Sequence, residues 1–287
     1  MVGNKMNNAG EIAAKVMFLI CALISIAAVL AICFFIFING FPAMQKIGIS
    51  KFLLGSRWKP SLDKYGIFPM IVGSIYITGG AAAVGVPLGI LTAVCLTVYC
   101  RGTLYKAVKS SINFLAGIPS VVYGFFGLSV IVPAVRRIFG VSGKGIFTAS
   151  VVLGIMILPT VVSICESSLA AVPKGYLEGS LALGATTERS VFKVLLPAAG
   201  SGVVSSVILG IGRAIGETMA VVMIAGNQAV IPKSVFSGVR TLTANIVLEM
   251  SYAAQLHRGA LIATAVVLFV FILIINLCFA AVKGCRT

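Results

Sequence analysis

The sequence predicts an all-α, polytopic membrane protein with six transmembrane helices. Of its 287 residues, 59% are apolar and only 10% are charged, whereas soluble domains carry about 25% charged residues. The mean hydropathy is +1.11. Six apolar runs are long enough to cross a bilayer, and each must be helical because the hydrocarbon core offers no partner for a free backbone group. These spans and their connections leave no stretch for a separate soluble catalytic domain.

The first run, Val16–Ile38, follows Lys5 and Lys15 and has 23 residues. This length exceeds the apolar region of a signal peptide, and no small-residue cleavage site follows closely. We therefore expect an uncleaved helix. The later spans are expected to return the chain to the side on which it began, and they cover 68–98, 112–132, 146–165, 203–226 and 260–282.

Prolines and glycines mark special points within these spans. Pro87, Pro119 and Pro159 each interrupt one run, which membrane helices tolerate when neighbouring groups satisfy the freed carbonyl. Kinks are expected there. Glycine pairs at four-residue spacing also allow two helices to approach closely, and the sequence has two such pairs, Gly85 with Gly89 and Gly212 with Gly216.

The fifth run carries two charged residues, Arg213 and Glu217. Arg213 would lie on the order of 15 Å deep, where a charge costs about 2.5–3.5 kcal/mol on insertion scales. Spacing of four places both side chains on one helix face, so an ion pair is available. We interpret the pair as lining a substrate pathway, with Glu217 orienting a guanidinium that offers forked donors to an oxyanion. The alternative is a structural salt bridge between helices.

The segment between 166 and 202 is expected to form a helix-turn-helix outside the bilayer. Residues 178–184 have helix-compatible spacing and are followed by Ala185-Thr186-Thr187. A second helical piece, Glu188–Leu196, is expected to be closed by Pro197.

On the other side of the membrane, 227–258 is too polar to span. Its amphipathic stretch Leu242–Met250 predicts an interfacial or re-entrant helix that caps a pathway. His257, the only histidine, has no Cys, Asp or Glu at ligand spacing. Neither a metal site nor a histidine-based triad is therefore expected.

The chain carries 22 Lys and Arg against 7 Asp and Glu, a net charge of +15. In a membrane protein this excess favours headgroups or an anionic partner or substrate over nucleic acid, for which no motif is present. With the N-terminus inside, ten cations would lie inside and eleven outside, so charge counting does not orient the chain. The first external loop would carry five cations, Lys46, Lys51, Arg57, Lys59 and Lys64, against one acid, Asp63. It would therefore attract anions at long range; the alternative is a solvated loop with no role in substrate binding.

Two glycine-rich segments fail as nucleotide-binding motifs. Residues 140–145 have the wrong spacing for a phosphate loop and no hydroxyl after Lys144. Residues 210–216 have three residues where the dinucleotide fingerprint has two. The chain is therefore not expected to be an enzyme or to hydrolyse ATP, and no cofactor is expected on it. Its seven cysteines show no paired spacing and are interpreted as small hydrophobes.

The segment beginning at Glu178 resembles a known family motif. Glu178-Gly179-Ser180, three residues, Gly184, nine residues and Val194-Leu195-Leu196-Pro197 are similar to the EAA loop, E-A-A-x3-G-x9-I-x-L-P, of ABC importer permeases. Gly179-Ser180 replaces the alanine pair, and Val194 replaces the isoleucine. The resemblance implies the MetI-like permease fold. It also implies that 178–197 faces the cytoplasm and docks on a separate ATPase subunit, which places both termini in the cytoplasm.

Two further segments resemble phosphate importers of the Pst system, and PstC-type subunits in particular. They are Gly117-Ile118-Pro119-Ser120-Val121-Val122-Tyr123-Gly124 and the stretch from Gly210 to Ala220, which contains Arg213-x3-Glu217-Thr218-Met219. The resemblance implies a permease subunit that moves inorganic phosphate across the cytoplasmic membrane. It also implies that Arg213 and Glu217 matter to transport.

The implied partners are a second, PstA-like permease, two PstB-like ATP-binding subunits, a PstS-like extracytoplasmic phosphate-binding protein and membrane lipids. The chain would divide into an N-terminal helix with the first external loop, 1–66, and a permease core, 67–287, with a coupling loop at about 166–202. The coupling residues would be Glu178, Gly179, Ser180, Gly184, Val194, Leu196 and Pro197. The alternatives are a permease for sulfate or molybdate and a secondary transporter driven by an ion gradient.

Overall fold

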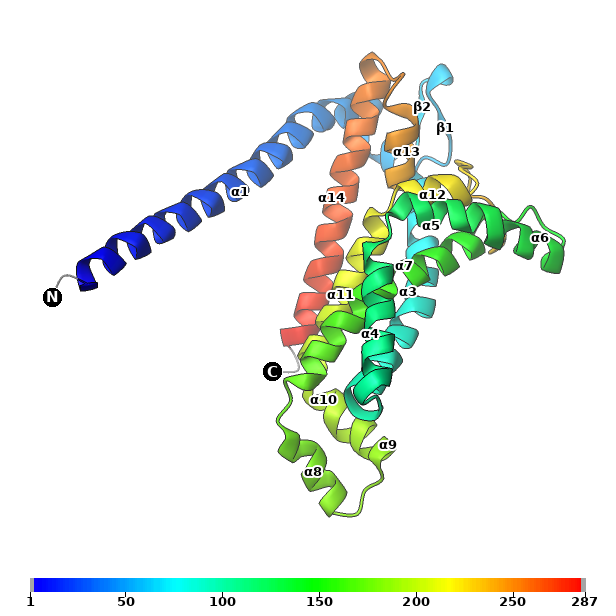
Figure 1. The fold of residues 1–287 in the computed structure, drawn as a ribbon. Helices are drawn as coiled ribbons and strands as arrows, with labels where there is room; N and C mark the ends of the chain where they lie inside the picture. The colour runs from blue at the N-terminus through cyan, green and yellow to red at the C-terminus, as the bar shows by residue number, and fades with distance from the viewer. Residues whose placement is uncertain (1–2, 285–287) are drawn as a thin grey trace.

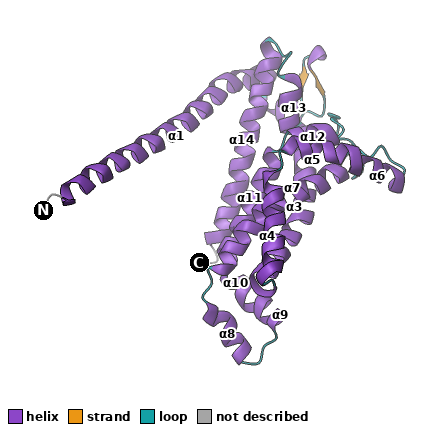
Figure 2. Ribbon diagram, in the orientation of Figure 1, coloured by secondary structure: helices purple, strands orange, loops and turns teal. Residues whose placement is uncertain are grey.

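A computed structural model of the chain describes residues 3–284 and is mostly helical (Figures 1 and 2). Its first half contains α1 (Gly3–Ile47), α2 (Ile49–Leu54), β1 (Trp58–Lys59), β2 (Lys64–Tyr65), α3 (Phe68–Val94), α4 (Gly102–Gly117), α5 (Ser120–Phe126) and α6 (Val132–Phe139). Its second half contains α7 (Ile146–Ala170), α8 (Lys174–Ala182), α9 (Thr187–Ser190), α10 (Leu196–Ala198), α11 (Gly200–Gly216), α12 (Met219–Ile224), α13 (Leu242–Glu249) and α14 (Gln255–Gly284). Three π-helical turns, at Cys95–Tyr99, Gly127–Ile131 and Val191–Leu195, connect successive helical pieces.

The helices α3, α7 and α11 form the centre of the bundle. Glycine makes their contact close: a Cβ at Gly85 would lie 2.6 Å from the Gly154 carbonyl oxygen, and one at Gly89 would lie 2.7 Å from Val161. The close approach predicted at this pair is confirmed. The second predicted pair makes no close contact within residues 3–284, because a Cβ at Gly212 or Gly216 would meet nothing within 4 Å.

Five helical segments of the described chain are long and apolar enough to cross a membrane, or six if a bent pair counts as one span. The first, second and fourth predicted runs lie within Gly10–Ile47, Phe68–Tyr99 and Ile146–Ala170, and the sixth, 260–282, overlaps Gln255–Cys278. The bent pair joins Thr187–Ala198 to Gly200–Gly216 at 76°. The polytopic helical fold expected from the apolar runs is confirmed.

The third predicted span is not one continuous helix. The run from 112 to 132 is divided at Ile118-Pro119, between α4 and α5, because proline has no N–H and its neighbour is pushed towards extended backbone. Ile118 is extended, with φ −72° and ψ 126°. The hydroxyl of Tyr123 donates to the Leu115 carbonyl oxygen across the break, at 2.8 Å. The segment that can span is Ser120–Phe139, which begins after the break.

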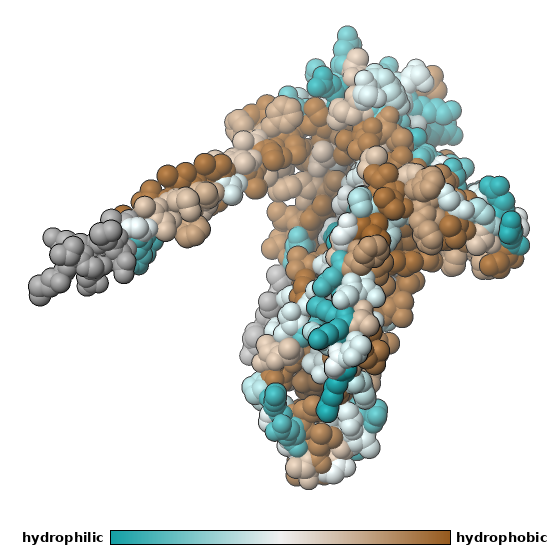
Figure 3. All heavy atoms as spheres, viewed as in Figure 1, coloured by the Kyte–Doolittle hydropathy of each residue, from teal (hydrophilic) through white to brown (hydrophobic). Residues whose placement is uncertain are grey.

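The first helix crosses α14 near Gly40, and its N-terminal part extends away from the bundle (Figure 1). A Cβ at Gly40 would lie 2.8 Å from Val266, and the Phe37 and Phe269 rings meet edge to face. Before this crossing the helix is exposed and apolar, as at Phe18 and Leu30. The brown surface along α1 in Figure 3 shows this apolar cover.

The two ends of the bundle differ in structure. The short helices α8, α9 and α10 lie at one end, and the β1–β2 hairpin and α13 lie at the opposite end (Figure 1). The hairpin pairs Trp58 with Tyr65 in an antiparallel register. Its aromatic side chains join a buried cluster with Phe52, Met70 and Leu242, which fixes the hairpin against the start of α3.

Candidate functional site: a broken span with an exposed arginine

Arg213 lies in the last turn of α11 and its side chain is exposed. One guanidinium nitrogen, Nη1, donates to the Thr160 hydroxyl of α7 at 3.2 Å. Within residues 3–284 no carboxylate lies within ion-pair distance of this guanidinium. An arginine presents five N–H donors, so most of its donor capacity faces outward from the bundle.

Glu217 does not share a helix face with Arg213, and the predicted ion pair is wrong. The helix α11 ends at Gly216, and Glu217 has extended backbone with φ −68° and ψ 127°. Its Oε1 instead accepts the backbone N–H of Ala220 at 3.0 Å, which satisfies a free donor at the start of α12. Glu217 therefore stabilises the second half of a broken span.

The break at Glu217-Thr218 lies close to the break at Ile118-Pro119. The helix α5, which follows Pro119, packs on α12, which follows Thr218, and Gly124 permits the contact. A Cβ at Gly124 would lie 2.8 Å from Ala220 Cα. Two interrupted helices thus pack together beside Arg213. In membrane proteins, irregular backbone at the depth of the bilayer is tolerated only where it is buried in protein or lines a water-filled cavity.

The helix face that bears Arg213 has little side-chain cover. Gly212 and Gly216 lie on either side of it with open space around them, while Gly210 packs on Val161 of α7. The exposed face of α11 therefore combines one forked cation with two glycines. Such a face leaves room for a polyatomic anion beside the guanidinium.

The predicted coupling segment is a helical hairpin at one end of the bundle. Glu178, Gly179 and Ser180 lie on α8, which begins at Lys174, four residues before the predicted start. Gly184 follows α8 with φ +81°, a left-handed conformation that favours glycine. Its N–H donates to the Leu181 carbonyl oxygen at 2.9 Å. The predicted turn between two helical pieces is confirmed.

The second helical piece extends slightly further than predicted. Val194 lies in the π turn, and Leu196 and Pro197 form the first turn of α10, which continues to Ala198. The continuous piece Thr187–Ala198 therefore ends one residue after Pro197, where the chain bends by 76° into α11, which agrees with the predicted closure to within one residue. The Ser180 and Ser190 hydroxyls lie 2.8 Å apart and join α8 to the second piece.

Glu166 anchors the end of α7 beside this hairpin. Its carboxylate accepts hydrogen bonds from the Tyr105 hydroxyl, at 2.8 Å, and from the Lys109 ammonium group, both on α4. The hydrogen bond to Glu166 raises the pKa of Tyr105, so this phenol remains a donor. Sequence spacing gives no signal for this contact, because Lys109 and Tyr105 lie 57 and 61 residues from Glu166.

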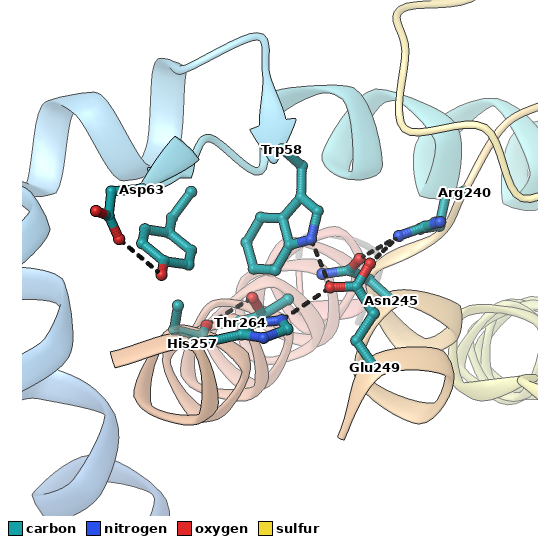
Figure 4. Close-up of polar contacts among 9 residues, drawn as sticks. Trp58, Asp63, Arg240, Asn245, Glu249, His257 and Thr264 are labelled. Carbon is teal, nitrogen blue, oxygen red and sulfur yellow. Dashed lines mark hydrogen bonds and ion pairs between the residues drawn. The ribbon is translucent and has the colours of Figure 1, made fainter. Parts of the chain in front are cut away.

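A buried polar cluster lies at the opposite end of the bundle (Figure 4). Glu249, at the end of α13, accepts from the Trp58 indole N–H at 2.8 Å and from Arg240 at 2.5 Å, and pairs with His257 at 2.9 Å. Arg240 also donates to the Asn245 side-chain oxygen at 3.0 Å. The sequence spacing around His257 predicted no metal site or triad and gave no sign of this contact, which forms because the turn between α13 and α14 brings Glu249 to His257.

The fold and this arrangement define a class: a helical, multi-pass membrane subunit with an interrupted span and an exposed helical hairpin at one end. The chain belongs to the family of binding-protein-dependent transport system inner membrane components, whose model matches residues 85–283. It is a permease subunit of an ABC importer and not an enzyme.

Relatives are similar over most of the chain. The probable ABC transporter permease YqgH of Bacillus subtilis is 40% identical and aligns over 93% of this chain and 90% of its own. The phosphate transport system permease protein PstC of Haemophilus influenzae is 35% identical, over 87% and 85% of the two chains. A probable PstC of Methanocaldococcus jannaschii is 30% identical, over 85% and 84%.

Solved structures of importers share the fold. A chain of the MetNI methionine ABC transporter in an inward-facing conformation has a TM-score of 0.61 at 22% identity, with 80% of this chain and all (100%) of that chain covered. A chain of a bacterial ABC transporter for the acidic polysaccharide alginate has a TM-score of 0.60 at 12% identity, with 95% and 97% covered. These likenesses confirm the MetI-like permease fold.

Proposed function

We propose that the chain is the permease subunit through which an ATP-driven importer moves inorganic phosphate across the cytoplasmic membrane. The observation that carries the proposal is the exposed Arg213 guanidinium on a glycine-flanked helix face beside two broken spans. The relatives named as phosphate permeases are 35% and 30% identical over most of the chain. They favour phosphate over sulfate or molybdate, which an arginine could also bind.

The pathway would run along the exposed face of α11. A guanidinium there supplies planar, paired donors to a tetrahedral oxyanion and offsets part of the anion's loss of hydration. A second donor, the Thr160 hydroxyl, lies 3.2 Å from Nη1. Because this face is exposed in the single chain, a second permease subunit would complete the wall of the pathway.

Glu217 would serve transport by holding the break open. Its carboxylate caps α12 through Ala220, and its own carbonyl oxygen accepts from the Thr243 hydroxyl at 3.2 Å. The first bond joins the break to α12, and the second joins it to α13. A movement of α13 on the outer side would therefore reach the turn that ends α11, four residues from Arg213.

ATP would be hydrolysed by separate subunits that dock on the α8–α10 hairpin. This hairpin presents exposed apolar side chains, including Tyr176, Leu183 and Phe192, beside the exposed carboxylate of Glu178. Exposed apolar patches of this kind are typical of protein interfaces. The hairpin would face the cytoplasm together with both termini, and its coupling residues would be Glu178, Gly179, Ser180, Gly184, Val194, Leu196 and Pro197. A phosphate-binding protein would dock at the opposite end.

The test is uptake by the assembled importer in proteoliposomes. Labelled phosphate should accumulate only when ATP is supplied in the compartment that holds the ATPase subunits. Excess sulfate or molybdate should not compete with phosphate for uptake. If sulfate at equal concentration competed with phosphate, the substrate would have to be reassigned to another oxyanion. Uptake driven by an ion gradient without ATP would replace the proposal with secondary transport.

A further inference from the structure

A basic cavity lies beside the β1–β2 hairpin, far along the chain from Arg213. It has a volume of about 490 Å³, and its lining comes from the end of α1, α2, the hairpin and the start of α14. Four of its lining side chains are cations, Lys46, Lys51, Arg57 and Lys64, against one acid, Asp63. We refer to it as the hairpin pocket.

The charge of the hairpin pocket is not neutralised by the protein. None of the four cations forms an ion pair among residues 3–284. Asp63 accepts from the hydroxyl of Tyr65, another lining residue, at 3.3 Å, and forms no ion pair with the four cations. Burial and Asp63 together raise the pKa of Tyr65, so this hydroxyl keeps its proton and remains the donor. A cavity with three net positive charges, four cations less one acid, attracts an anion.

The surroundings of the hairpin pocket indicate which anion it receives. Apolar side chains are exposed immediately beside it, at Phe41 on α1 and at Ile49 and Leu54 on α2. The pocket therefore lies where the apolar surface of α1 ends and basic residues begin. This is the level of the phosphate groups in a bilayer, whose headgroup regions together add roughly 10–15 Å to the hydrocarbon thickness.

We propose that the hairpin pocket binds the phosphate group of an anionic membrane phospholipid, whose acyl chains lie along the exposed surface of α1 and α2. This site is separate from the Arg213 pathway and does not rest on the proposed transport function. The bound lipid would join α1 to the hairpin, since Lys46 belongs to the helix and Arg57 and Lys64 belong to the loop and β2.

The test uses the full-length chain in phosphatidylcholine nanodiscs with trace spin-labelled lipid. The motionally restricted fraction should be larger for phosphatidylglycerol than for phosphatidylcholine. Each charge removed should lower the phosphatidylglycerol preference about fivefold, since a basic residue near an anionic surface contributes roughly 1 kcal/mol. Lys64→Gln should show one such step, and the fourfold variant Lys46→Gln/Lys51→Gln/Arg57→Gln/Lys64→Gln should abolish the preference.

A matched variant controls for the loss of net charge. Lys59→Gln/Arg137→Gln/Lys144→Gln/Lys233→Gln removes the same four charges from exposed positions that do not line the hairpin pocket, and it should retain the preference. Equal preference in the fourfold pocket variant and in the wild type would overturn the proposal. If that variant were to misfold, the single Lys64→Gln step decides the outcome.

Two further outcomes would overturn the lipid assignment. Displacement of the labelled lipid by inorganic phosphate at constant ionic strength, beyond that caused by chloride, would make the ligand the free ion. Unchanged lipid preference together with lost stimulation of ATP hydrolysis by the binding protein, in the fourfold variant of the assembled importer, would make it an acidic protein surface. We expect that inorganic phosphate will not displace the labelled lipid beyond the effect of chloride, and that the fourfold variant will lose its lipid preference.

Discussion

Two arginines of this fold, Arg240 and Arg213, differ in how many hydrogen-bond partners the protein gives them. Arg240 is enclosed by its own chain: it contacts Glu249 at 2.5 Å, the Asn245 oxygen at 3.0 Å and the Asn227 carbonyl oxygen at 3.1 Å. Arg213 has one hydroxyl partner and an exposed side chain. The arginine held by three protein partners maintains structure, and the one with a single hydroxyl partner is available to a ligand.

The contrast extends to the backbone around each residue. Glu249 closes the regular helix α13, and its carboxylate collects Trp58, Arg240 and His257. Glu217 follows a helix end and serves only the backbone of the next helix. An acid close in sequence to an arginine is therefore weak evidence for a pair, because the local backbone decides where each side chain points.

The largest effect on stability is expected from Glu249→Gln. This change leaves Arg240 and His257 without a buried carboxylate, and breaking a buried pair from one side costs about 3–5 kcal/mol. The thermal midpoint of the purified chain should fall by several degrees. The exposed Glu188→Gln is the control and should shift the midpoint little. An unchanged midpoint for Glu249→Gln would remove the distinction between the two arginines.

The next effect is expected on transport, from Arg213→Gln. Phosphate uptake by the assembled importer should fall by roughly 100-fold, since charged hydrogen bonds contribute about 1.5–3 kcal/mol each. The midpoint of unfolding should remain close to that of the wild type, because the side chain is exposed. Arg213→Lys keeps the charge but not the fork and should fall between the two. Wild-type uptake by an assembled Arg213→Gln importer would discard the pathway.

The smallest effects are expected from replacing a glycine of the coupling hairpin with alanine, at Gly184 or at Gly179. Gly184→Ala places a Cβ at φ +81°, which costs about 1–2 kcal/mol, and should weaken ATPase binding or the coupling of hydrolysis to uptake. Gly179→Ala lies within α8 and should stabilise the helix by about 1 kcal/mol. The affinity of the ATPase subunits for each variant checks these two expectations. Equal behaviour of the two would argue against a role for the turn.

The apolar runs predicted most of the fold because hydropathy reports burial in lipid directly. The same signal cannot detect a break inside a run. Pro119 was recognised as a point of interruption, but the composition on both sides stays apolar, so its full effect on the helix was missed. The sequence indicates the end of α11 only weakly, by the glycine Gly216 that precedes Glu217-Thr218.

The site was predicted in part. Arg213 stands out because a cation within an apolar run is costly, and the coupling hairpin stands out by its spacing. The cluster around Glu249 joins Trp58, Arg240 and His257 across up to 191 residues. Polar residues in loops are ordinary, and nothing in their spacing reveals that the fold brings them together.

The central claim is that a positive charge at position 213 lines a water-filled path for an anion. It is tested most directly by Arg213→Cys in a cysteine-free background of the assembled importer. Phosphate uptake should be lost, then restored at least in part by a methanethiosulfonate that attaches an aminoethyl group, and not by its neutral or sulfonated counterparts. Failure of these water-soluble reagents to modify the cysteine, or equal recovery with the neutral reagent, would contradict the claim.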